Sequence, residues 1–157
     1  MSKSLRFNLI LLSVVSLLAL LVWYAQPRPP LPLTAIDPSS VSRIEISDLA
    51  GRHILLQRQN GVWRTPDGPA RRERIEQLLG ICGTASLERF PATGELARYG
   101  LDPVAIHLTL NDEQLDFGAT DPIHGWRYVR YQQQIHLIAD GFYHHLNANA
   151  DAWKETP

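Results

Sequence analysis

The sequence predicts an α+β fold in which an N-terminal transmembrane helix precedes one domain of mainly antiparallel strands with two or three helices. Three observations support this prediction. A continuous apolar run occupies residues 7–25, alternating apolar and polar segments recur within residues 41–64 and 104–139, and a segment with helical spacing lies between them. Strands, then helices, then strands again, joined by short turns, are the order expected of an α+β domain.

The apolar run over residues 7–25 has the length and composition of a membrane-spanning helix. At ~1.5 Å per residue it extends about 28 Å, close to the ~30 Å hydrocarbon core of a bilayer. Lys3 and Arg6 precede the run and only Arg28 closely follows it, so the positive-inside rule places residues 1–6 in the cytoplasm. We therefore expect a single-pass protein of the inner (cytoplasmic) membrane whose C-terminal domain lies in the periplasm.

A cleaved signal peptide and an ordinary buried helix are the alternatives for this run. A cut after Ala25 would place the bulky Trp23 where a signal peptidase site carries a small residue, which favours an uncleaved anchor. Four prolines between residues 26 and 33 predict a stiff spacer within a linker over residues 26–40. The same prolines could serve a proline-recognition domain, but a spacer is the interpretation that suits a segment beside a membrane helix.

Residues 41–157 are predicted to form one extracytoplasmic α+β domain. Asn60-Gly61 is typical of a two-residue hairpin turn between alternating segments. Pro69 suits the first turn of a helix, where a missing N–H does no harm. Cys82 lies on the apolar stripe of that helix, so we expect a buried, unreactive thiol. The strands expected in this half cover residues 41–47, 53–59 and 62–64, and the helix begins at residue 71.

The second half is predicted to contain a short helix, four more strands and a terminal helix. Gly100 fits the left-handed position just after a helix, with Leu101 contacting Leu96 as in a Schellman cap. The expected elements are a helix over residues 94–99, strands over 104–110, 114–117, 126–131 and 134–139, and a helix over 141–146 that extends toward Trp153.

The charges of the domain argue against several classes of function. From Asp37 onward 12 basic residues accompany 16 acidic ones, a formal charge of −4 that offers no field for nucleic acid. The nearest approach to a carboxylate pair, formed by Asp112, Glu113 and Asp116, lies around an expected hairpin turn, where acidic residues are common. The sequence has no nucleophile elbow and no phosphate-binding loop, so we predict no catalytic residues and no enzyme activity.

Six histidines raise the question of a metal site. His144 and His145 are adjacent on an expected helix, so their side chains should diverge and not share an ion. His107 and His136 are expected on the polar faces of their strands, without a third ligand. We therefore predict no metal site and no cofactor.

Four aromatic residues form a possible surface for a partner or ligand: Trp63, Trp126, Tyr128 and Tyr131. They cluster in expected hairpins, where exposed rings can contact a protein or stack on a saccharide. Large aromatic residues also dominate the cores of small domains, so core filling is the competing interpretation.

The order of several short motifs resembles a known bacterial family. An alternating strand follows the hydrophobic anchor, an amphipathic helix and an apolar strand follow in turn, and the motifs between them are Asn60-Gly61-Val62-Trp63, Tyr99-Gly100-Leu101-Asp102-Pro103, Phe117-Gly118 and Tyr128-Val129. Over residues 41–140 this pattern resembles the domain of unknown function 4340 family of membrane-anchored proteins. Some relatives resemble auxiliary parts of ABC-type transport systems of the gliding-motility kind, and the resemblance implies no catalytic residues.

These observations favour a membrane-tethered, non-enzymatic accessory domain that binds a protein partner in the cell envelope. The family resemblance suggests an ABC-type transport system as the assembly that it assists. An envelope ligand-binding module, which uses the aromatic hairpins for a saccharide or peptide, is the alternative. An exposed aromatic groove would favour the ligand, and a flat apolar patch would favour the protein partner.

Overall fold

The computed structural model of the chain describes residues 3–25 and 30–155, and for residues 3–6 it describes the backbone alone. The helices are α1 Lys3–Tyr24, α2 Arg72–Leu79 and α3 Tyr143–Leu146. The 3-10 turns are η1 Pro38–Ser40, η2 Gly80–Gly83, η3 Leu96–Tyr99, η4 Asp140–Phe142 and η5 Ala150–Trp153. The strands are β1 Arg43–Asp48, β2 His53–Gln59, β3 Val62–Thr65, β4 Gly68–Pro69, β5 Glu88–Pro91, β6 Ile106–Leu110, β7 Glu113–Thr120, β8 Arg127–Tyr131 and β9 Gln134–Ile138.

Within this described part the strands form one nine-stranded sheet in the order β4-β3-β2-β1-β6-β7-β8-β9-β5. Every neighbouring pair is antiparallel, and together with the helices this confirms the predicted α+β class. The two outermost strands are short and each contains a proline, Pro69 in β4 and Pro91 in β5. Proline at a sheet edge removes a backbone donor and discourages pairing with another chain.

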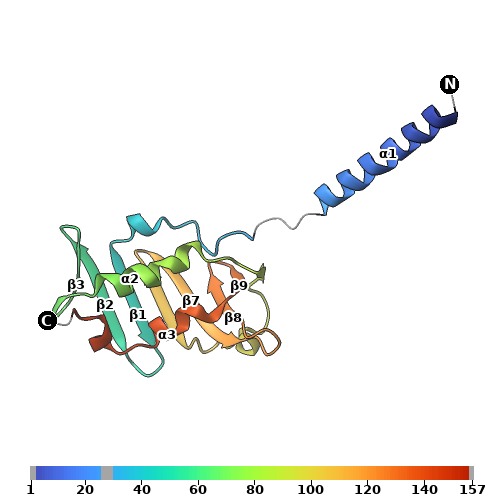
Figure 1. Cartoon of the computed structure of the whole chain (residues 1–157). Helices are drawn as coiled ribbons and strands as arrows, with labels where there is room; N and C mark the ends of the chain where they lie inside the picture. The colour runs from blue at the N-terminus through green and yellow to red at the C-terminus, as the bar shows by residue number, and fades with distance from the viewer. Residues whose placement is uncertain (1–2, 26–29, 156–157) are drawn as a thin grey trace.

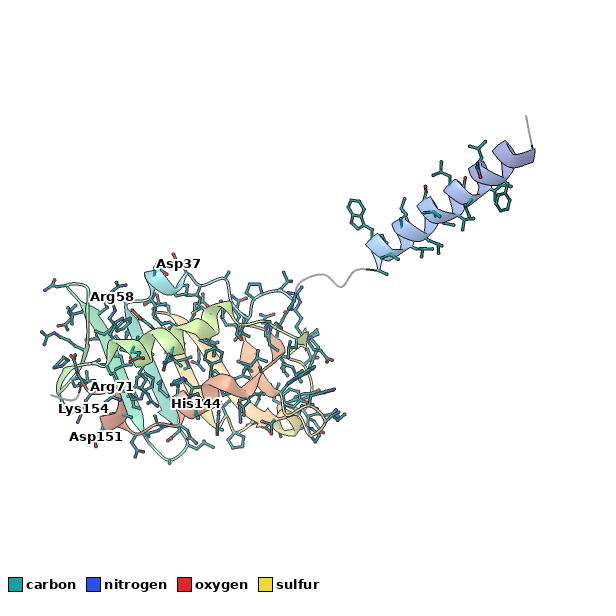
Figure 2. All side chains as sticks on the ribbon, viewed as in Figure 1. Asp37, Arg58, Arg71, His144, Asp151 and Lys154 are labelled. Atoms are coloured by element: carbon teal, nitrogen blue, oxygen red, sulfur yellow. The ribbon has the colours of Figure 1, made fainter. Side chains whose placement is uncertain are left out.

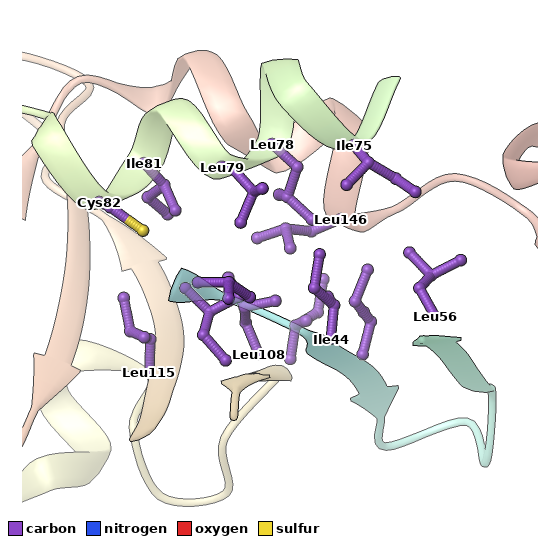
Figure 3. Close-up of a cluster of buried hydrophobic side chains, with 14 of the residues drawn as sticks. Ile44, Leu56, Ile75, Leu78, Leu79, Ile81, Cys82, Leu108, Leu115 and Leu146 are labelled. Carbon is purple, nitrogen blue, oxygen red and sulfur yellow. The ribbon is translucent and has the colours of Figure 1, made fainter. Parts of the chain in front are cut away.

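One face of the sheet is covered by helices and holds the core. Figure 1 shows α2 and α3 lying across this face. Ile75 and Leu78 of α2 point toward Ile44 of β1 and Leu108 of β6, and all four side chains are fully buried (Figure 3). On the opposite face of these strands Glu45 and its neighbours are only partly buried, which leaves the centre of that face open to solvent.

The first helix agrees with the predicted anchor. Its segment Phe7–Tyr24 is long and apolar enough to span a membrane, and none of that segment is buried against the rest of the chain. Figure 2 shows its side chains projecting on all sides of α1. The Asn60-Gly61 hairpin, the β8–β9 hairpin and the burial of Cys82 also follow the sequence prediction.

The folded domain begins earlier than the predicted boundary at residue 41. Leu33 is buried, and its N–H donates to the carbonyl of Thr84 over 2.8 Å, while Ser86 N–H donates to the carbonyl of Leu31 over 2.9 Å. Thr34 is buried as well and donates from its hydroxyl to the Cys82 carbonyl. Residues 31–40 therefore belong to the domain because they complete its backbone pairing. Of the proline spacer predicted over residues 26–33, residues 26–29 lie outside the described residues.

Three further elements differ from the prediction. Pro69 lies in β4 and not in a helix, because the chain pairs once more with β3 before α2 begins at Arg72. β5 was not expected, since its residues pair with β9, which lies more than 40 positions away in the sequence. The terminal helix is confined to residues 143–146 and is continued only by 3-10 turns, so Trp153 reaches the core without a long helix.

Candidate functional site

The face of the sheet opposite the helices is partly covered toward β8, β9 and β5. Alternation along β8 directs Val129 and Tyr131 into the core beneath the helices and leaves Tyr128 and Arg130 on the other face. Trp126, two residues before Tyr128, is partly exposed. At this end of the sheet the segment around η3 packs against β7 and builds a second layer.

The η3 segment is fixed in place by a Schellman cap. Gly100 has a φ of 66°, its N–H donates to the Ala97 carbonyl over 3.0 Å, and Leu101 N–H donates to the Leu96 carbonyl over 3.1 Å. This geometry confirms the predicted cap. It turns the Leu101 side chain inward, where it is 2% exposed.

Two glycines allow η3 to lie close to β7. A Cβ on Gly118 would lie 3.0 Å from Leu101 Cγ and closer still to the Tyr99 carbonyl oxygen. A Cβ on Gly100 would lie 2.6 Å from the backbone nitrogen of Ala119. The approach of Gly118 to the Tyr99 oxygen and that of Gly100 to the Ala119 nitrogen are both too close for a real Cβ atom. Only glycine therefore fits at either position. The close approach places Tyr99 directly over the aromatic residues of the neighbouring strands.

Five rings from four parts of the chain gather here. The Tyr99 ring lies 5.4 Å from Phe90 of β5 and 4.9 Å from Tyr128 of β8, both in tilted arrangements. Trp126 stacks on His124 at 4.3 Å with an interplanar angle of 17°. All five rings are partly or fully exposed, and we call them the aromatic surface. Such tilted and stacked pairs stabilise one another beyond their buried area.

The loop between β7 and β8 extends this surface. Asp121 is 9% exposed and accepts a hydrogen bond from His124 N–H over 2.7 Å, and its own N–H donates to the Trp126 carbonyl. The Asp121 pKa lies below its usual value, chiefly because of the His124 backbone donor. These bonds hold Ile123 at the tip, where its side chain is 80% exposed. No other large apolar side chain in residues 30–155 is as exposed.

An ionic network lies beside Tyr128 on the open face. Asp116 of β7 is 4% exposed and accepts from Arg130 Nε over 2.8 Å, from Gln114 over 2.7 Å, and from His107 Nδ1 over 2.6 Å. Burial alone would raise the Asp116 pKa, but the hydrogen bonds from Gln114, His107 and Arg130 outweigh it, so the pKa is lowered. Both carboxylate oxygens are occupied, so the group stays ionised and is not available as a general base.

A buried arginine joins this region to the helix layer. Arg127 forms an ion pair with Asp140, donates to the Gly118 carbonyl over 2.6 Å, and lies 3.5 Å above the Tyr143 ring. It therefore ties β7 and β8 to η4 and α3. The aromatic surface rests on a rigid base as a result.

The structure separates the four aromatic residues singled out in the sequence. Trp126 and Tyr128 lie in the aromatic surface, whereas Trp63 and Tyr131 lie in the core with exposures of 6% and 9%. Phe90 and Tyr99 were not expected in such a surface. In the sequence, Tyr99 is marked only by its place in the helix-cap motif, directly before Gly100, whose φ is positive. That motif explains a cap and does not by itself predict an aromatic surface.

The histidines depart from expectation in two places. His136 is 5% exposed and its Nδ1 lies 2.9 Å from the Ser86 hydroxyl, so it is not on a solvated face. The rings of His144 and His145 do not diverge, because their centroids are 3.8 Å apart. No group of three His, Cys, Asp or Glu side chains suited to a metal ion occurs among the residues that the structure describes.

The comparison with known families bears on the residues that build this surface. The model of a domain of unknown function, DUF4340, matches residues 63–157. The chain belongs to the DUF4340 family. No curated protein and no solved structure matches it. Three of the motifs on which the DUF4340 resemblance rests, around Tyr99, Gly118 and Tyr128, meet at the aromatic surface.

Proposed function

We propose that this DUF4340 protein is a membrane-tethered, non-enzymatic accessory protein whose aromatic surface binds a protein partner in the cell envelope. The observation that carries the proposal is Ile123, an 80% exposed apolar side chain held on a loop that is already hydrogen-bonded, beside the stacked Trp126. Protein interfaces favour aromatic anchors on rigid supports, because little conformational entropy is then lost on binding.

The N-terminal helix supports the tether in this proposal. Its apolar segment would span the inner membrane, and the basic residues before it favour a cytoplasmic N-terminus and a periplasmic domain. Attachment to the membrane raises the effective concentration of a membrane partner, so a modest surface is sufficient for binding. Family resemblance to auxiliary proteins of ABC-type transport systems makes a component of such a system the partner that we propose.

The surroundings of one carboxylate on the open face and of one thiol in the core favour binding over catalysis. The buried carboxylate of Asp116 is fully hydrogen-bonded, and Cys82 is 1% exposed with a pKa raised by burial. A thiol of this kind is a poor nucleophile. The rings of Trp126 and Tyr128 instead provide exposed surface without a reactive group.

Co-purification of variants tests the proposal. Ile123→Asp places a charge at the centre of the proposed interface, and we expect the full-length chain carrying it to lose its envelope partner on gentle detergent extraction. Val62→Asp is the matched control, because Val62 is 53% exposed at the start of β3, away from the aromatic surface. Equal partner recovery for both variants and the unmodified chain would contradict the proposal.

A specific pocket favours the alternative of a ligand-binding module. Trp63 contributes to the wall of a pocket of about 370 Å³, together with Arg58, Arg72 and Leu79. Arg58 lies near the η1 turn and donates to the Ser39 carbonyl (Figure 2). This volume lies within the ~300–1,000 Å³ range of small-molecule sites. Binding of an envelope saccharide or peptide that Trp63→Phe weakens, and Ile123→Asp does not, would support this alternative.

A further inference from the structure

A second pocket lies where the chain enters the domain. It has a volume of about 310 Å³, and one wall is formed by residues 31–35, the first part of the domain after α1. The opposite wall comes from β5 and the β8–β9 hairpin, which contribute Arg89, Tyr131, Gln132, Gln134 and His136. The pocket is thus built by the first residues of the domain and by the end of the sheet against which they pair.

The length of the chain holds this pocket near the membrane surface. Five residues separate Ala25, next to the end of α1, from Leu31, whose carbonyl accepts from Ser86 N–H. A chain extends at most ~3.4 Å per residue, so Leu31 lies within about 20 Å of the helix end. The aromatic surface loop at Ile123 lies at the other end of β8 from the Gln132 turn, so the two sites face opposite directions.

The pocket has the donors and the charge that a phosphate group requires. Arg89 is exposed and has no acidic partner anywhere in residues 30–155. Burial and the adjacent Arg89 lower the His136 pKa, so its imidazole is neutral and serves as a hydrogen-bonding group without charge. The side-chain amides of Gln132 and Gln134 are exposed beside it. Arginine is suited to phosphate because its guanidinium offers several donors in one plane.

An exposed apolar side chain lines the same pocket, and a second belongs to the segment that pairs with it. Leu31 is 53% exposed and Leu87 is 39% exposed, and their segments are joined by the backbone bond between Ser86 and Leu31. A phosphate beside exposed aliphatic groups matches the boundary between the headgroups and the acyl chains of a bilayer. The domain as a whole is acidic, so attraction to a negative membrane has to come from a local site of this kind.

We propose that the pocket around Arg89 binds the phosphate of an anionic phospholipid headgroup and so orients the domain on the membrane. The inference rests on the proposed membrane anchor but not on the proposed protein partner. An oriented domain holds the Ile123 loop away from the bilayer, in the position where a second envelope protein would meet it.

Hydrogen–deuterium exchange on the full chain in nanodiscs tests this inference. We expect residues 31–35 and 86–92 to exchange about fivefold more slowly in phosphatidylcholine with phosphatidylglycerol than in phosphatidylcholine alone, the factor for one arginine at an anionic surface. Arg89→Gln should abolish this difference. Arg64→Gln, which changes another exposed arginine on β3, should preserve it.

Several results would overturn the inference. Equal exchange in the two lipid compositions, or an unchanged difference in Arg89→Gln, would exclude a site for anionic headgroups at Arg89, because phosphatidylcholine carries a phosphate but no net charge. Equal protection of the detergent-solubilised chain by inorganic phosphate would show a site for free phosphate and not for lipid. A chain that fails to enter nanodiscs would refute the membrane anchor, and with it the inference. A failure to find the protein partner would not affect the inference, because the headgroup site does not depend on that partner.

Discussion

Gly118→Ala is the substitution that most severely disturbs the base of the aromatic surface. The new Cβ would lie 3.0 Å from Leu101 Cγ and closer to the Tyr99 carbonyl oxygen. The oxygen belongs to the backbone, so the η3 segment has to move away from β7 to make room. Overpacking of this kind costs about 1–3 kcal/mol, and we expect a loss at the upper end because a backbone atom is involved.

Denaturant unfolding of a soluble fragment over residues 26–157 measures this loss. Gly141→Ala is the control, because a Cβ there meets no atom within 4 Å and the residue does not have a positive φ. We expect that control to change the free energy of unfolding by less than about 1 kcal/mol. Gly100→Ala should behave like Gly118→Ala, since its Cβ would lie 2.6 Å from Ala119 N and its φ is 66°.

Close packing of η3 on β7 would be excluded if Gly118→Ala were as stable as the Gly141→Ala control. A loss of less than about 0.5 kcal/mol would be within the range of ordinary surface substitutions and would mean that η3 does not lie against β7. Asp102→Ala provides a further comparison, because Asp102 is exposed beside the cap. It should destabilise the domain less than either glycine substitution; a larger loss would show that the motif is held by its carboxylate and not by close packing.

Three further predictions concern the domain boundary, the acid response and the topology. A fragment that starts at Thr34 should have a free energy of unfolding about 2–4 kcal/mol lower than one that starts at Gln26, because it lacks the buried Leu33 and its backbone bonds. Equal stability of the two fragments in urea would contradict this. The lowered Asp116 pKa stabilises the fold above the unfolded pKa, so this contribution should fall as pH drops through the folded pKa. Asp116→Asn should flatten that acid limb in pH-dependent unfolding, and an unchanged limb would assign it to other groups. Alkaline phosphatase fused to the C-terminus should be active in cells, whereas an inactive fusion would place the domain in the cytoplasm.

The strands β1, β2 and β3 could be predicted from the sequence because each pairs with the next one along the chain through a short turn. Ile44 and Ile46 alternate with polar residues, and Asn60-Gly61 provides the turn that joins β2 to β3. The amphipathic stripe of α2 was equally clear, since Ile75, Leu78 and their neighbours all face one sheet surface. In these elements local pattern and tertiary packing require the same arrangement.

The sheet end near β5 could not be predicted in this way because β9 is buried on both faces. Ile135 and Leu137 lie beneath the η3 layer while His136 and Ile138 face the other side, and all four are buried. A strand covered on both sides has no alternation that identifies the core. The sequence therefore assigned His136 to solvent, and it gave no indication of β5, whose pairing with β9 depends on contacts over long separations in the chain.

The aromatic surface was predictable only in part, for a related reason. Trp126 and Tyr128 are two positions apart, so their shared face follows from strand geometry. Phe90 and Tyr99 reach the same place through the packing of η3 on the glycines of β7, which no local pattern reveals. Trp63 and Tyr131 also lie in hairpin strands, but their side chains face the helices.

Site-specific photo-crosslinking in living cells tests most directly whether this surface binds a partner. A photoreactive amino acid replaces Ile123 in one full-length variant and Leu49 in another; Leu49 is 66% exposed on the β1–β2 turn. We predict one discrete adduct with an envelope protein at position 123, identified by mass spectrometry as a transport component, and none at position 49. Partner binding through the aromatic surface is excluded if both positions give the same adducts, or if position 123 gives none while the chain is present in the membrane.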